Sequence, residues 1–120
     1  MINIRNLLLP LLFVSQLSYG NDGNDLLKKC SYAVDIFKTR DLSHEAEGLF
    51  CMAFVSGVRD TLTIMTLDHS SIKVCFPKNG INTEHSVKLV HKYLKLNPND
   101  LGENDALLVI KAFAKSYPCN

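Results

Sequence analysis

Four cysteines, Cys30, Cys51, Cys75 and Cys119, follow a short apolar N-terminus and lie far apart from one another in the sequence. An even number of cysteines in a small exported chain indicates disulfides, because compartments outside the cytosol are oxidising. Their separations of 21, 24 and 44 residues lack the close Cys-x-x-Cys pairs that are typical of zinc sites and thioredoxin-like redox sites. The cysteines therefore predict two disulfides, and we expect neither a bound metal nor another cofactor.

The first 20 residues have the organisation of an export signal. One positive charge, Arg5, precedes a largely apolar stretch over residues 7–17, and Ser18-Tyr19-Gly20 ends in small residues where a signal peptidase cleaves. The apolar stretch is about half of the roughly 20 residues that span a bilayer. We expect cleavage after Gly20, a periplasmic location without a membrane anchor, no second apolar segment long enough to span, and one soluble domain over residues 21–120.

Apolar residues recur every three or four positions along most of this domain, which is the spacing of amphipathic helices. The pattern and its capping residues predict four helices: Asp25 to Lys38 with Asp25 as its cap, Glu45 to about Leu67, Thr83 to Leu96 after an Asn82 cap, and about Glu103 to Ser116. Turn-forming residues between Asp68 and Ile81 predict a structured loop. The expected fold class is all-α, a small four-helix, disulfide-stapled bundle that can include an extra short helix.

Helices joined by short connections become antiparallel neighbours, and this constrains the cysteines. Cys30 lies eight residues before the end of the first helix and Cys51 lies six after the start of the second, so we expect the two to face each other at similar depth. The fourth helix returns toward the start of the third, which brings Cys119 beside Cys75. Of the three ways to pair four cysteines, we therefore predict Cys30–Cys51 and Cys75–Cys119.

Gly57 lies inside the second helix, where a glycine costs about 1 kcal/mol relative to alanine. We expect it to mark a place where another helix packs closely.

No constellation of catalytic side chains stands out. His85 and His91 lie about 240° apart on their helix, so they cannot easily share a ligand. The run Asp68-His69-Ser70-Ser71 contains the residue types of a catalytic triad, but neighbours in sequence do not form triad geometry, and a polar surface loop is the simpler interpretation. Acidic residues near the helix starts are explained by the helix dipole: Glu45, Glu47, Asp100, Glu103 and Asp105. The sequence favours a binding protein over an enzyme.

The charges of the domain balance. Removing Arg5 from thirteen basic residues leaves twelve, equal to the twelve acidic ones, so we expect no nucleic acid partner. One helix carries a basic stripe, Lys88, Lys92 and Lys95, with His85 one turn earlier. The stripe could meet an acidic partner, although a solvated face with a Glu84–Lys88 pair is the more ordinary interpretation.

Several short motifs occur in a characteristic order. They are Phe50-Cys51-x-x-Phe54-x-x-Gly57-Val58-x-Asp60, Cys75-Phe76-Pro77 with Gly80-Ile81, Tyr93-Leu94-x-x-x-Pro98, and Ala112-Phe113-Ala114-x-x-Tyr117-Pro118-Cys119. In this order the chain resembles the Rap/Tai immunity proteins from about Cys30 to Cys119. The resemblance implies a small periplasmic helical protein of bacteria that use type VI secretion. Such proteins bind and neutralise a secreted effector, typically a peptidoglycan amidase, and often act as homodimers.

The resemblance does not identify the residues that contact an effector, and we look for them in the loops. A crosslinked loop loses little entropy on binding, so the loop around Cys75 is the expected inhibitory surface. Its candidate residues are Asp68, His69, Ser70, Ser71, Lys73, Lys78 and Asn79.

A periplasmic acid-stress chaperone is the alternative. Such proteins open at low pH to expose apolar surface, which would suit a chain with four histidines. Two disulfides argue against easy opening.

Overall fold

The computed structural model describes residues 21–67, 71 and 73–120, and it contains four α-helices. They are α2 (Gly23–Thr39), α3 (Glu45–Leu67), α4 (Thr83–Leu96) and α5 (Asp105–Ser116), with a short 3₁₀ helix, η1 (Pro98–Asp100), between the last two. The described residues include no strand, only an isolated β-bridge between Asp22 and Asn104. The predicted all-α fold with an extra short helix is confirmed. The predicted export signal, residues 1–20, lies outside the described residues.

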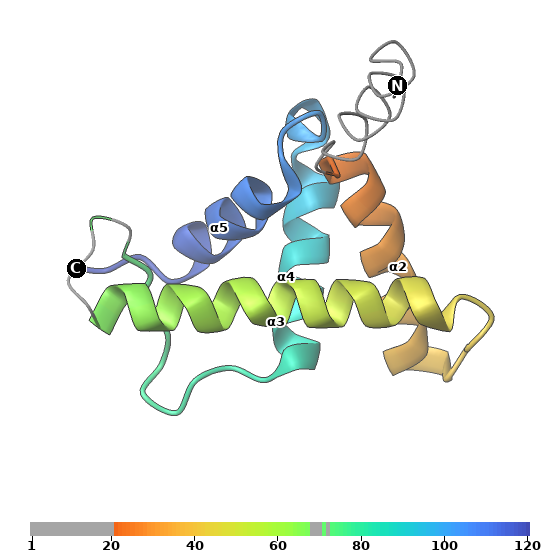
Figure 1. Cartoon of the computed structure of the whole chain (residues 1–120), viewed down its shortest axis with the longest axis horizontal. Helices are drawn as coiled ribbons and strands as arrows, with labels where there is room; N and C mark the ends of the chain where they lie inside the picture. Colours follow the sequence, from red (N-terminus) through yellow and green to blue (C-terminus); the bar gives the residue numbers. More distant parts are fainter. Residues whose placement is uncertain (1–20, 68–70, 72) are drawn as a thin grey trace, which may run out of the picture.

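The longest helix, α3, lies across the other three. In Figure 1, α2 crosses α3 toward its N-terminal end, α4 crosses near its middle, and α5 descends toward its C-terminal end. We expected sequential helices to run side by side, but α3 crosses its neighbours steeply. Its 23 residues extend over about 35 Å, so three shorter helices find room along one side of it. Buried side chains from all four helices form one core with Val74, including Leu26, Val55, Val87, Leu94 and Phe113.

The helix starts show which polar side chains act as caps. Asp22, not Asp25, caps α2, and its carboxylate accepts from the backbone N–H of Asp25 at 3.1 Å. The prediction was wrong because a contact distant in sequence holds the chain one turn earlier: the Gly23 N–H donates to the Glu103 carbonyl oxygen at 3.1 Å. Asn104 caps α5 in the same way, so this helix begins at Asp105. The predicted Asn82 cap of α4 is confirmed.

The close approach between α2 and α3 occurs at Gly48, and the prediction for Gly57 was wrong. A Cβ atom added at Gly57 would have no neighbour within 4 Å, whereas one at Gly48 would lie 2.6 Å from Ile36 Cδ1 and 3.2 Å from the Ala33 nitrogen. Gly48 is one helical turn from Cys51. The disulfide brings the two backbones together there, so a side chain at Gly48 has no space.

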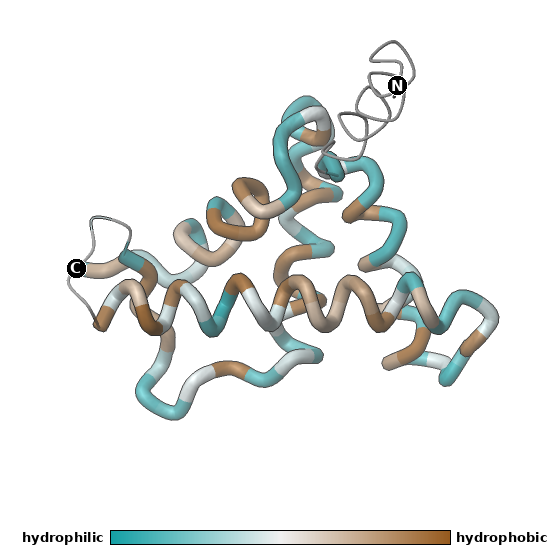
Figure 2. The backbone as a smooth tube through the Cα atoms, in the orientation of Figure 1, coloured by the Kyte–Doolittle hydropathy of each residue, from teal (hydrophilic) through white to brown (hydrophobic). Residues whose placement is uncertain are grey.

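By length and composition, α3 could cross a membrane, contrary to the expectation that no second segment could. One face of α3 is nevertheless buried in the core of the protein, where it contributes Cys51, Val55 and Leu62. Figure 2 shows that hydrophobic residues continue along much of the helix. Several large ones are exposed: Leu49, Phe50, Ile64 and Leu67. The helix therefore leaves apolar surface uncovered after the fold has formed.

Candidate functional site

Both predicted disulfides are present. Cys30–Cys51 joins α2 to α3 inside the core, and Cys75–Cys119 joins the segment between α3 and α4 to the C-terminal end of the chain. The Cα atoms lie 5.1 Å apart in each bridge, within the usual range. All four cysteines are consumed in this way, which excludes a metal site built from their thiolates.

The described part of the segment between α3 and α4, residues 71 and 73–82, is here called the anchored loop. Beside the disulfide, the Cys75 N–H donates to the Tyr117 carbonyl oxygen at 2.9 Å. Val74 is buried, and its N–H and carbonyl both bond to the Thr66 hydroxyl, at 3.3 and 3.1 Å. Phe76 packs edge-to-face on Phe113, with ring centroids 5.3 Å apart. The middle of the loop is therefore attached to both α3 and α5.

A second attachment holds the end of the anchored loop. Arg59 Nη1 on α3 donates to the Ile81 carbonyl oxygen at 3.1 Å and lies 3.4 Å from the Ser86 hydroxyl. Between the two attachments the chain makes a turn in which the Gly80 N–H donates to the Pro77 carbonyl oxygen at 2.7 Å. Gly80 has a φ of 71°, a conformation that favours glycine. The turn carries the exposed side chains of Lys78 and Asn79.

The described members of the predicted binding set are all exposed. Ser71 and Lys73 precede the buried Val74, and Lys78 and Asn79 follow Phe76, so the attached segment separates two exposed pairs. Asp68, His69 and Ser70 lie outside the described residues. A hollow of about 600 Å³ lies between the loop and α3, lined by Arg59, Thr63, Thr66, Phe76 and Ile81 among others.

Sequence reasoning missed the two side chains on α3 that hold the loop, Arg59 and Thr66. A signal for Arg59 was present, because it is the one basic residue of α3 and a cation that is partly buried needs polar partners. Thr66 carried no such signal, since threonine occurs on helix surfaces without a tertiary role.

The described histidines do not converge on one site. His85 Nε2 lies 2.9 Å from the Tyr117 hydroxyl, and His91 Nε2 lies 3.1 Å from the Ser31 hydroxyl. The third, His44, stacks on Tyr32 with ring centroids 4.0 Å apart. Burial lowers the pKa of His91, and the nearby cations Lys95 and Lys38 lower it further. Each ring therefore has a separate packing role.

The acidic residues near the helix starts also have local roles. Burial raises the pKa of Asp105, in the first turn of α5, although its carboxylate accepts from the Ala106 N–H at 2.7 Å. Glu103 pairs with Lys111 at 2.6 Å. Glu45 and Glu47 lie in the first turn of α3. The positions of Glu45 and Glu47 agree with stabilisation by the helix dipole. At Asp105 burial outweighs the dipole, and Glu103 precedes the Asn104 cap.

Comparison with known protein families gives one match. The sequence model of the Rap1a immunity proteins matches residues 22–119, which is nearly all of the chain after the predicted export signal. No curated protein and no solved structure matches the chain. The matched range includes all four helices, both disulfides and the anchored loop. The chain belongs to the family of Rap1a immunity proteins.

Proposed function

We propose that this protein protects its cell by binding a type VI secretion effector and covering the active site of that effector. The family match supports an immunity role. The observation that carries the mechanism is the anchored loop, whose exposed turn at Lys78 and Asn79 lies between two attachments to the helices. A loop held in this way needs little further ordering when it enters a cleft, so more of the contact energy remains as affinity.

We further propose that the effector is a peptidoglycan amidase. Its substrate lies in the periplasm, and the chain would reach that compartment through the export signal at residues 1–20, cleaved after Gly20. The immunity protein would contribute no catalytic group and would act on no nucleic acid. It would prevent entry of the peptide substrate, and the effector would supply the catalytic residues.

The inhibitory surface combines the two exposed pairs of the anchored loop with the residues that precede them. Its proposed members are Asp68, His69, Ser70, Ser71, Lys73, Lys78 and Asn79. Lys73 and Lys78 give it positive charge, which would guide the loop toward an acidic cleft rim and speed association.

The protein is also proposed to form a homodimer through α3. The exposed apolar side chains of this helix support a second copy as the covering partner, since Ile64 and Leu67 are 67 and 74% exposed. A shallow, mostly apolar hollow of about 470 Å³ lies beside them, lined by Phe54, Val58, Met65 and Ile110 among others. Large apolar patches on a monomer indicate interaction sites.

The test measures binding to the product of the neighbouring open reading frame, which this proposal predicts to be a peptidoglycan amidase. Reversing both loop charges, Lys73→Glu with Lys78→Glu, should weaken binding at least about tenfold, which corresponds to roughly 1.4 kcal/mol. Lys28→Glu with Lys38→Glu is the matched control, because both of these lysines are exposed on α2. Unchanged binding of the loop variant would refute the surface. Failure of the wild-type protein to bind, together with suppression of client aggregation at about pH 2 to 3, would instead support the acid-stress chaperone.

A further inference from the structure

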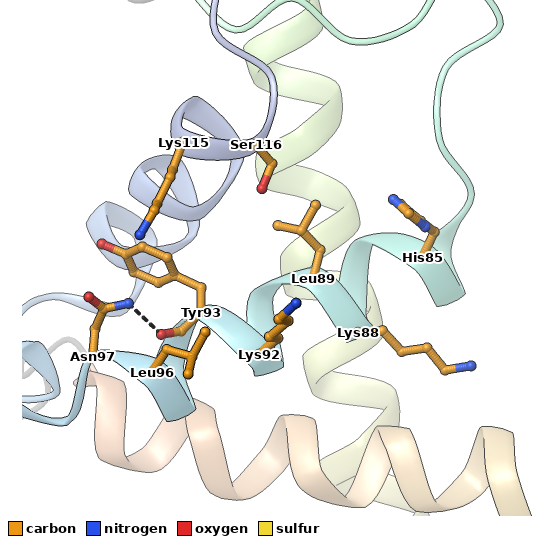
Figure 3. Close-up of a pocket in the computed structure, with 9 residues that line it drawn as sticks. All are labelled: His85, Lys88, Leu89, Lys92, Tyr93, Leu96, Asn97, Lys115 and Ser116. Carbon is orange, nitrogen blue, oxygen red and sulfur yellow. Dashed lines mark hydrogen bonds between the residues drawn. The ribbon is translucent and has the colours of Figure 1, made fainter.

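A second concave surface lies between α4 and α5, outside the proposed inhibitory loop. It is a groove of about 570 Å³, and Figure 3 shows its side chains. The apolar part consists of Leu89, Tyr93 and Leu96, all on α4. Around them lie His85, Lys88 and Lys92 from α4 and Lys115 from α5. The groove therefore combines an apolar floor with a cationic rim.

The apolar floor is a second hydrophobic stripe on α4. The first stripe faces the core and consists of Val87, Val90 and Leu94, which are fully buried. Positions 89, 93 and 96 have the spacing of a separate helix face, about 100° or more away from the core face. Leu89 and Tyr93 are only partly covered, and Leu96 is 67% exposed. Leu89 and Tyr93 pack partly against the core, but neither is fully covered, so this second stripe leaves apolar surface open to solvent.

The rim carries uncompensated positive charge. Lys88 is paired with Glu84, but Lys92 and Lys115 make no ion pair with any residue that the structure describes. The Lys115 ammonium lies 6.0 Å from the centre of the Tyr93 ring, which keeps the cation over the apolar floor. Because the domain as a whole is neutral, this concentration of cations is a local feature of the groove.

One end of the groove is linked to the anchored loop through Tyr117. His85 at its end bonds to the Tyr117 hydroxyl at 2.9 Å, and the Tyr117 carbonyl oxygen accepts from Cys75 in the loop. A partner that contacts the loop could therefore extend a segment directly into the groove.

We infer that the groove binds an acidic, amphipathic helix of the partner protein. Apolar side chains of that helix would cover Leu89 and Tyr93, while its carboxylates would pair with Lys92 and Lys115. From His85 to Asn97 the groove follows about three helical turns, or roughly 18 Å, which is long enough for the i, i+3, i+4 and i+7 anchors of a helix bound in a groove. A concave site suits a peptide better than a flat anionic membrane does. The inference rests on the proposed function only for the source of the helix, which is the effector.

The test needs no effector. The probe is a fluorescein-labelled helical peptide of about 14 residues, with Leu on one face and Glu on the other, and its control has Lys in place of Glu. We expect the mature wild-type protein to bind only the acidic peptide, with affinity that falls as salt is added. Lys92→Gln with Lys115→Gln should weaken binding about tenfold. Lys28→Gln with Lys38→Gln on α2 should leave it unchanged.

A second readout locates the complex. Addition of the acidic peptide should shift the backbone amide NMR signals of Leu89, Tyr93 and Lys115, and a Leu89→Ser, Leu96→Ser variant should lose these shifts. Three results would overturn the inference: no binding at about 1 mM peptide, equal binding of both peptides, or shifts confined to other helices.

Binding to vesicles of anionic phospholipid, with the same lysine dependence and without peptide binding, would assign the groove to a membrane surface. Effector binding is measured separately, so the proposed function and this inference can fail independently.

Discussion

Arg59 and Ile81 are joined by a hydrogen bond of 3.1 Å from a guanidinium on α3 to a backbone carbonyl at the end of the anchored loop. The bond spans 22 positions in the sequence and holds the last residue before the Asn82 cap of α4. Because the Arg59 side chain is only 16% exposed, water competes weakly for this donor. The pair therefore fixes the loop relative to α3 at the end opposite Val74.

Arg59→Gln should release this end of the loop. Hydrogen bonds to charged groups contribute about 1.5 to 3 kcal/mol, so we expect the free energy of unfolding in urea to fall by about that amount. Asp60→Asn is the control, because the Asp60 carboxylate pairs with Arg59 but is 65% exposed, and its loss should cost under about 0.5 kcal/mol. Equal destabilisation by both variants would show that the loop bond contributes little.

Removing the loop disulfide should destabilise the protein and free the loop locally. Cys75 and Cys119 are 44 positions apart, so the chain-entropy argument gives about 4 kcal/mol for a Cys75→Ala, Cys119→Ala variant. Denaturation in guanidinium measures this loss. Amide hydrogen exchange should show that Val74 and Cys75 lose protection while α2 keeps it. Retained protection at Val74 would mean that Thr66 and Phe76 hold the loop without the bridge.

Two glycines on α3 should respond in opposite directions to alanine. At Gly48 the new methyl would meet Ile36 Cδ1 and the Ala33 backbone, and overpacking of this kind costs about 1 to 3 kcal/mol. At Gly57 nothing lies within 4 Å, so Gly57→Ala should stabilise the helix by about 0.5 to 1 kcal/mol. Thermal unfolding of both variants checks the pair. Destabilisation by Gly57→Ala would contradict the open surface found at that position.

His91 should make the protein less stable in mild acid. Its ring faces Ser31, Asp35 and Lys38 on α2 and Lys95 on its own helix. Its pKa in the folded state is below the ordinary value of 6.5, which applies to the unfolded chain. Between these two pKa values the unfolded chain therefore binds more protons than the folded protein does. The stabilisation is complete above 6.5 and is lost as the pH falls through the folded pKa.

The matched variant for this prediction is His91→Gln, which retains a polar partner for Ser31. Urea unfolding between about pH 7.5 and pH 5 should show the wild type losing stability relative to the variant. Parallel curves for the two proteins would assign the acid response to other groups.

Ile64→Lys should convert a homodimer into monomers. Ile64 is 67% exposed on α3, so the substitution leaves the core intact and places a charge in the proposed interface. Light scattering after size-exclusion chromatography measures the mass. Leu42→Lys, at a 56% exposed leucine before α3, should leave the mass unchanged. A wild-type protein that is monomeric at about 100 μM would refute the dimer, since obligate interfaces persist at much lower concentrations.

Local signals predicted the helices well. The spacing of Val87, Val90 and Leu94 and the Asn82 cap located α4 at its observed bounds, because periodicity and capping depend on neighbours within one or two turns. The start of α2 was harder to predict. Asp22 and Asp25 are equally good caps in sequence, and the contact between Gly23 and Glu103 decided between them.

The candidate site was only partly predictable. The turn formers around Lys78 and Gly80 revealed a loop. The charge of Arg59 indicated that it needs polar partners, but nothing in the sequence placed the partners of Arg59 and Thr66 in the loop, because these are backbone groups whose positions depend on the fold. The groove was equally hidden. The basic stripe at Lys88 and Lys92 was visible on α4, whereas Lys115 comes from a helix whose placement no spacing reveals.

The chain's own residues thus settle its secondary structure and its crosslinks. Apolar periodicity forms the helices, and the order of those helices brings Cys30 to Cys51 and Cys75 to Cys119. Tertiary packing decides which surfaces remain for partners. It closes the space at Gly48, leaves Gly57 and Ile64 open, and places Lys115 opposite Tyr93. Surfaces of this kind depend on the angles at which helices cross, and those angles follow from side-chain packing between elements that are distant in the sequence.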